Sequence, residues 1–221
     1  MNNTSITDIL GEDDAGFNYM PAPEIAHFHN LEILPSKREI HLTGDINEDT
    51  GAWFYKCMRW LEIKAPTSPI RVVIATNGGD VESMFTIHDT IRNSPCPVQT
   101  VGIGEVLSAG VLILACGDHR LVHENIGVMA HEFSGADEEL GQKAWKERGK
   151  FRDWQAAKWA ELLARYTQMT PRQWTNKLNS KGEFWLLGSD AIIKAGIADA
   201  MVEIRSDIRD DITKRQYPYF P

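Results

Sequence analysis

The sequence predicts a single α/β domain built on a mostly parallel sheet. Strand-like and helix-like patterns alternate along the chain with short links between them, as in folds that lay helices against parallel strands. The stretch IRVVIAT at 70–76 is a nearly continuous β-branched run, which is typical of a strand covered on both faces. With 221 residues, 43% of them hydrophobic, the chain can form a sizeable core.

The first strands and helices follow from hydrophobic periodicity. REIHLTG at 38–44 alternates like a half-buried strand, and residues 47–64 place apolar side chains on one helical face. After the Asn77-Gly78-Gly79 turn, Asp80 is expected to cap the next helix. A strand at 98–103 leads to a helix opened by Ser108. Further elements are expected at 120–123, 126–131, about 137–166 and 199–204.

Composition excludes several classes of function. The net charge is −8, with 31 acidic and 23 basic residues, so nucleic acid and anionic membranes are poor partners. The longest apolar run, 109–116, is far shorter than the ~20 residues that cross a bilayer. The first residues lack the pattern of a secretion signal. Three widely spaced cysteines argue against a disulfide framework, so a reducing, cytoplasmic setting is expected.

The sequence lacks the complete form of several nucleotide-binding and hydrolase motifs. A dinucleotide-type G-x-G-x-x-G beginning at Gly102 is broken by Leu107 at its third glycine position. The nucleophile elbow G-x-S-x-G around Ser108 is broken by Val106. No G-x-x-x-x-G-K-[ST] phosphate loop occurs. The chain is therefore not expected to bind a cofactor, and any ATP would be used by a partner.

A metal site is not expected either. HEFSG begins like the zinc motif H-E-x-x-H, but Gly135 occupies the second histidine position. His119 and His123 could both face a metal, yet no third ligand is evident. Surface or structural histidines are the favoured interpretation.

The remaining pattern suits acyl transfer. Ser108 opens a helix, where backbone N–H groups favour developing negative charge, and the small residues Ala109 and Gly110 leave room for a substrate backbone. His131 ends an apolar strand and could take the serine proton and return it. The alternatives are a plain helix cap for Ser108 and a hydrogen-bonded core residue for His131.

Four ordered motifs resemble the ClpP-type serine peptidases. They are LTG at 42–44, NGGD at 77–80 after a β-branched strand, SAG at 108–110 and VMAHEFSG at 128–135. The resemblance covers roughly residues 38–204. It implies the ClpP/crotonase-like ββα spiral core with a long protruding helix that contacts a second ring. It also implies that Ser108 is the nucleophile and His131 the base.

The resemblance assigns the other site residues as well. It implies that the oxyanion hole is formed by the amides of Gly79 and Ala109. The family's orienting acid is an aspartate, but this chain has Glu183 there, in KGEFWLLGSD. A glutamate can orient a histidine too. The alternatives are Asp190, more simply explained as a helix cap, and a Glu183 that is only solvated.

The expected organisation is an N-terminal arm at 1–34, mobile or propeptide-like, a protease domain at 35–205 and a tail at 206–221. The resemblance implies a homo-oligomer of two stacked heptameric rings that hydrolyses unfolded polypeptide, fed by a separate ring ATPase of the AAA+ class. One alternative is a catalytically silent ring subunit that acts in assembly or ATPase docking, motivated by Glu183. Crotonase-like acyl-CoA chemistry and a viral maturation peptidase are further alternatives.

Overall fold

The computed structural model of the chain describes residues 33–132, 142–179 and 182–203. The expected arm up to residue 32, the tail from 204, and the first residues of the long helix at 137–141 lie outside the described residues. Ile33 and Leu34 form a short strand, so the sheet begins two residues before the expected start of the domain at 35. The three cysteines are buried and free, as the sequence predicts.

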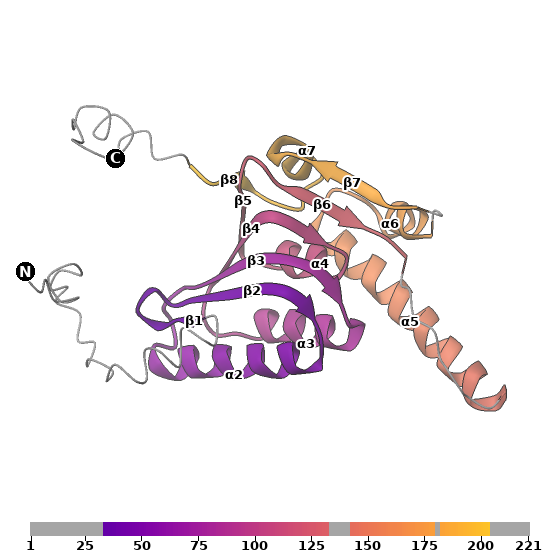
Figure 1. The fold of residues 1–221 in the computed structure, drawn as a ribbon, viewed down its shortest axis with the longest axis horizontal. Helices are drawn as coiled ribbons and strands as arrows, with labels where there is room; N and C mark the ends of the chain where they lie inside the picture. Colours follow the sequence, from indigo (N-terminus) through magenta and orange to yellow (C-terminus); the bar gives the residue numbers. More distant parts are fainter. Residues whose placement is uncertain (1–32, 133–141, 180–181, 204–221) are drawn as a thin grey trace, which may run out of the picture.

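The elements alternate along the chain as expected (Figure 1). The strands are β1 Ile33–Leu34, β2 Glu39–Ile46, β3 Ile70–Gly79, β4 Val98–Leu107, β5 His119–Val122, β6 Gly127–Ala130, β7 Phe184–Leu187 and β8 Ala200–Met201. The helices are η2 Pro35–Lys37 (a 3₁₀ turn), α2 Glu48–Lys64, α3 Val81–Arg92, α4 Ala109–Ala115, α5 Gln142–Tyr166, α6 Pro171–Leu178 and α7 Ser189–Lys194.

The sheet is mostly parallel, and along one edge the central strand β4 pairs with two different strands, one after the other. The order is β1-β2-β3-β4-β5-β8, with antiparallel pairing only between β1 and β2 and between β6 and β7 among the described strands. The first half of β4 pairs with β5, from Gln99 to Gly102, and its second half pairs with β6, from Glu105 to Leu107. The carboxyl end of β4 therefore lies against β6, not β5.

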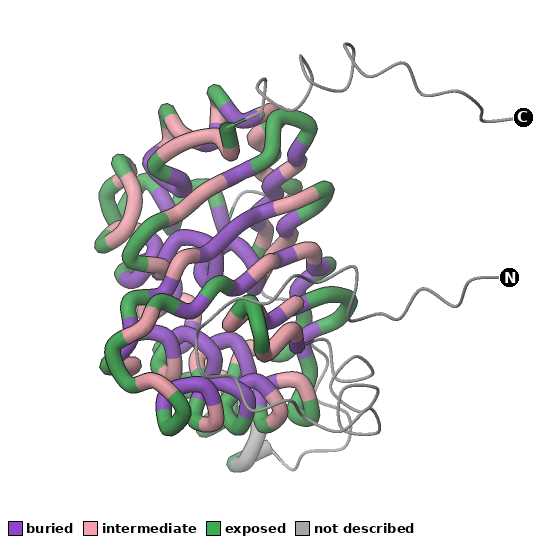
Figure 2. The backbone as a smooth tube through the Cα atoms, turned by 90° about the vertical axis from the view of Figure 1, so that its left-hand side faces the viewer, coloured by how far each residue is buried: buried purple, intermediate pink, exposed green. Residues whose placement is uncertain are grey.

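Helices α2, α3 and α4 pack on one face of this sheet (Figure 1). On β3 the residues Ile70, Val72 and Ile74 are fully buried, whereas Arg71 is exposed and Val73 is only partly covered. The same alternation holds for residues 39–42 of β2, whereas residues 100–102 of β4 and 128–130 of β6 are buried without a break; Figure 2 shows the buried and exposed stretches along the backbone. The expectation that 70–76 is covered on both faces is thus wrong for the single chain, because the helices cover one face only.

The predicted helix cap is confirmed at Asp80 and wrong at Asp190. The Asn47 side chain accepts the Thr50 amide at the start of α2, and the Asp80 carboxylate accepts the Ser83 amide at the start of α3. Asp190 does not cap α7. Gly188, with φ +78°, holds that position, and Asp190 lies in the first helical turn.

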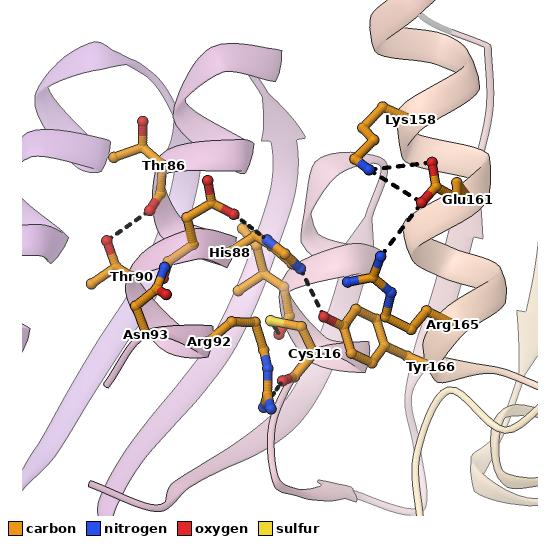
Figure 3. Close-up of polar contacts among 12 residues, drawn as sticks. Thr86, His88, Thr90, Arg92, Asn93, Cys116, Lys158, Glu161, Arg165 and Tyr166 are labelled. Carbon is orange, nitrogen blue, oxygen red and sulfur yellow. Dashed lines mark hydrogen bonds and ion pairs between the residues drawn. The ribbon is translucent and has the colours of Figure 1, made fainter. Parts of the chain in front are cut away.

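The long helix α5 leaves the body of the domain and is fixed to it at its carboxyl end (Figures 1 and 3). The buried ring of His88 on α3 lies 3.0 Å from the Tyr166 hydroxyl through Nε2 and 2.8 Å from the Asp89 carboxylate through Nδ1. Arg120 on β5 donates to the carbonyls of Tyr166 and Gly196 and pairs with Asp199. These contacts join α3, α5 and β5 to the last strand.

No helix within the described residues is long and apolar enough to span a membrane.

Candidate active site

Ser108 stands between β4 and α4 in a conformation unusual for a residue with a side chain. Its φ is +54° and its ψ is −118°. Such a conformation costs about 1–3 kcal/mol and persists only where the surroundings impose it. The Ser108 amide donates to the Met129 carbonyl at 2.6 Å, and the side chain makes no capping hydrogen bond to α4. The plain-cap interpretation of Ser108 is therefore wrong.

The Gly-Gly segment at the end of β3 presses directly against Ser108. A Cβ at Gly78 would lie 2.6 Å from the Ser108 Cβ and 3.0 Å from the Ala109 amide nitrogen, and Gly78 has φ +89°. A Cβ at Gly79 would lie 2.0 Å from the Ile46 carbonyl oxygen. Both glycines are thus needed so that the end of β3 can fit between β2 and Ser108.

Ala109 begins α4, a seven-residue helix that is buried along its whole length. The amides of a first helical turn have no acceptor within the helix, and Ser108 supplies no side-chain cap. The Ala109 amide and the Gly78-Gly79 segment therefore border the same side of Ser108. The structure brings together the residues expected to form an oxyanion hole, whose role remains a prediction.

His131 follows directly after β6, and the strand register brings it to the carboxyl end of β4. Leu107 pairs with Met129, whose carbonyl accepts the Ser108 amide, and His131 lies two residues further along. The His131 side chain is partly buried. Within the described residues, no hydrogen bond joins His131 to Ser108. The backbone contact between the two segments is the hydrogen bond from the Ser108 amide to the Met129 carbonyl, two residues before His131.

Glu183 reaches the same place through β7. The antiparallel register of β6 and β7 ends with the pair Ala130 and Phe184, so His131 directly follows one strand and Glu183 directly precedes the other. The Glu183 carboxylate is exposed, and it accepts a hydrogen bond from the Trp185 indole at 2.8 Å. Asp190 lies further along the chain in α7 and is exposed.

Trp185 is the site residue that sequence reasoning missed. It lies on β7 two residues after Glu183, which directly precedes the strand, and its ring comes within 3.5 Å of the position that a Cβ on Gly127 would take. Its side chain remains 40% exposed. The sequence signal is the spacing between Glu183 and Trp185: residues two apart in an extended segment point to the same side.

A metal site finds no support in the part of the chain that the structure describes, where no three His, Cys, Asp or Glu residues cluster in a way that could hold an ion. His119 is hydrogen-bonded through Nδ1 to the Gln99 amide at 2.9 Å. Gly135 and the rest of the HEFSG motif from Phe133 on lie outside the described residues.

The domain is thus a mostly parallel α/β sheet with a serine of positive φ at the junction of β4 and α4 and a glycine segment packed against it. The profile of the Clp protease family matches residues 24–205. The chain therefore belongs to the Clp protease family, with the ClpP fold that the motifs predict.

Two kinds of relative support this assignment. The chain is 30% identical over 180 residues to the ATP-dependent Clp protease proteolytic subunit 2 of Treponema pallidum, which covers 77% of this chain and 85% of the relative. It is 32% identical over 104 residues to the corresponding subunit of Treponema denticola, covering 46% and 52%. A ClpP1 point mutant from Listeria monocytogenes superposes with a TM-score of 0.68 at 26% identity, covering 78% of this chain and 95% of that one.

Proposed function

We propose that this chain is a serine endopeptidase of the ClpP type that hydrolyses unfolded polypeptides. The observation that carries the proposal is the strand register, in which β6 pairs with both β4 and β7, so that the strand ends next to Ser108, His131 and Glu183 in sequence belong to one part of the sheet. Family membership supports the same assignment. The three residues come from distant parts of the sequence, so their assignment to one site depends on this register.

In the proposed reaction, His131 takes the Ser108 proton while the serine oxygen attacks the scissile carbonyl. The amides of Gly79 and Ala109 donate to the resulting oxyanion. His131 then returns the proton to the leaving amine, which departs as a new amino terminus. Water, deprotonated by His131, attacks the acyl ester and releases the carboxylate and the free serine.

Two side chains must rotate before this reaction can begin. Glu183 has to exchange the Trp185 indole for His131, and His131 has to turn towards Ser108. Catalytic hydrogen bonds often tighten only when substrate is bound. We therefore place Glu183 as the orienting acid of the competent site and the Trp185 bond as a resting arrangement.

The assembly we propose is a homo-oligomer of two stacked heptameric rings, fed by a separate AAA+ unfoldase that uses the ATP. Helix α5 supports it, because this 25-residue helix projects from the domain and carries exposed aromatic side chains (Figure 1). Phe151 and Trp154 stack with centroids 5.8 Å apart, and they are 41% and 55% exposed. Such exposed aromatic surface is typical of a protein interface. A cytoplasmic location is part of the same proposal.

A catalytically silent ring subunit is the second candidate, and one observation favours it. The Glu183 carboxylate accepts a hydrogen bond from the Trp185 indole, and within the described residues no hydrogen bond joins the Ser108 side chain to the His131 ring. If these contacts persisted in the assembled particle, the chain would act in assembly or ATPase docking only. A viral maturation role would use the same residues as the housekeeping enzyme.

The experiment that separates the two candidates is active-site labelling of the assembled protein. A fluorophosphonate probe is expected to add once per chain, as measured by intact mass, and peptide mapping is expected to find it on Ser108. Ser108→Ala should abolish the adduct. Ser189→Ala is the matched control, because Ser189 is a buried serine at another helix start, and it should label like the wild type. An assembled wild type that takes no label would establish the silent subunit.

A further inference from the structure

Thr76 lies near the end of β3, two residues before Gly78, with only 3% of its surface exposed. Its hydroxyl donates to the Gly44 carbonyl on β2 and accepts the Gly78 amide at 3.0 Å. A hydroxyl has one proton, so donation to Gly44 leaves a lone pair directed at Gly78. Thr76 thus ties the start of the Gly-Gly segment to the neighbouring strand.

The methyl group of the same side chain touches the other wall of the site. A Cβ at Gly110 would lie 2.4 Å from the Thr76 Cγ2, so this methyl packs against the α4 backbone one residue after Ala109. One buried side chain therefore contacts the segment that carries the Gly79 amide and the helical turn that carries the Ala109 amide.

The Gly-Gly segment needs such an anchor. Gly78 and Gly79 have φ values of +89° and +145°. Glycine has no Cβ, so its backbone can adopt more conformations than that of any other residue. A rotation of the peptide between them would turn the Gly79 N–H away from the site. The Asp80 amide fixes the far end by donating to the Ile46 carbonyl at 2.8 Å. The near end is fixed by the Thr76 hydroxyl.

We infer that Thr76 is a positioning residue for the oxyanion hole, which sets the direction of the Gly79 amide through the hydrogen bond to Gly78 and supports Ala109 through Gly110. This inference rests on the proposed peptidase function. Thr76 does not touch the substrate. By aligning the Gly79 and Ala109 amides, Thr76 stabilises the transition state, because the negative charge on the oxyanion develops only in that state.

The test compares two substitutions at Thr76 with a fluorogenic peptide and the assembled enzyme. Thr76→Val keeps the shape but removes both hydrogen bonds, so kcat is expected to fall about 10- to 100-fold with little change in KM, less than the loss from deleting a whole oxyanion donor. Thr76→Ser keeps the hydroxyl and is expected to retain most of the wild-type kcat. If Thr76→Val does not assemble, Thr76→Ala serves in its place.

Thr100→Val is the matched control. Thr100 is a fully buried threonine on β4 whose hydroxyl donates to the Leu114 carbonyl at 2.7 Å, away from the Gly-Gly segment. It should lower the melting temperature to a similar extent as Thr76→Val and leave kcat unchanged.

The inference is overturned if Thr76→Val retains the wild-type kcat, if Thr100→Val loses as much kcat, or if Thr76→Ser is as slow as Thr76→Val. The failure of the proposed function looks different. In that case the wild type itself neither cleaves the peptide nor takes the fluorophosphonate label. Without peptidase activity there is no oxyanion to bind, so the role inferred for Thr76 is excluded together with the proposed function.

Discussion

Substitution of Gly78 by alanine should damage the proposed site directly, because Gly78 packs against Ser108. The new Cβ would lie 2.6 Å from the Ser108 Cβ and 2.8 Å from the Leu107 carbonyl oxygen. Carbon atoms at contact prefer about 3.5–4.0 Å, so the backbone on one side has to move. Forcing extra atoms into a packed region costs about 1–3 kcal/mol. The positive φ of +89° adds about 1–2 kcal/mol for a residue with a side chain.

Gly104→Ala is the matched control for this substitution. Gly104 also has a positive φ, +57°, but a Cβ there would meet nothing within 4 Å. It should therefore lose only the conformational part, about 1–2 kcal/mol. The difference between the two variants isolates the contact with Ser108.

The assay has two readouts, urea unfolding of the assembled protein and the rate of Ser108 acylation by a β-lactone. Gly78→Ala should be the less stable variant, and its acylation should fall by orders of magnitude, since Ser108 and the Ala109 amide are displaced. Gly104→Ala should acylate at nearly the wild-type rate. Equal stability and equal acylation of the two variants would refute the placement of Gly78 against Ser108.

Three further predictions follow from other contacts. Glu183→Gln should lower the single-turnover acylation rate by orders of magnitude with little change in assembly, because an amide cannot stabilise the imidazolium of His131, and an unchanged rate would remove Glu183 from the site. Burial lowers the pKa of His88 below its usual 6.5 despite the nearby Asp89 carboxylate, so the unfolded chain binds the extra proton first. Stability should therefore fall as the pH drops below about 6.5, and His88→Gln should flatten that part of a plot of melting temperature against pH. Trp154→Glu should shift the particle to smaller species in sedimentation velocity, because it puts a charge on the exposed aromatic pair of α5, and Lys150→Glu, a charge change at an exposed position of the same helix, should not.

Local patterns in the sequence predict much of the fold because the features they rely on are themselves local. The Asp80 cap depends on an amide only three residues away. The buried face of α2 depends on apolar residues that recur with the period of the helix. Asp190 shows the limit of this reasoning. An acidic residue near a helix start resembles a cap, but the preceding glycine adopts the positive φ and takes the position.

The candidate site depends on contacts between distant segments, which no local pattern contains. The order of the motifs predicts Ser108, His131 and Glu183, and the strand register supports their proximity. The hydrogen bond between Glu183 and Trp185 depends on side-chain rotation on an exposed face, which strand spacing alone does not determine. In the sequence Thr76 is one member of a β-branched run, and its two hydrogen bonds, to β2 and to the Gly-Gly segment, depend on contacts that this run does not contain.

The structure of the assembled protein after acylation by a β-lactone is the most direct measurement. We expect an ester on Ser108 whose carbonyl oxygen accepts hydrogen bonds from the Gly79 and Ala109 amides, with the Glu183 carboxylate turned from Trp185 to the His131 ring. An ester whose carbonyl faces solvent, with Glu183 still bonded to the indole and His131 turned away, would contradict the proposed mechanism.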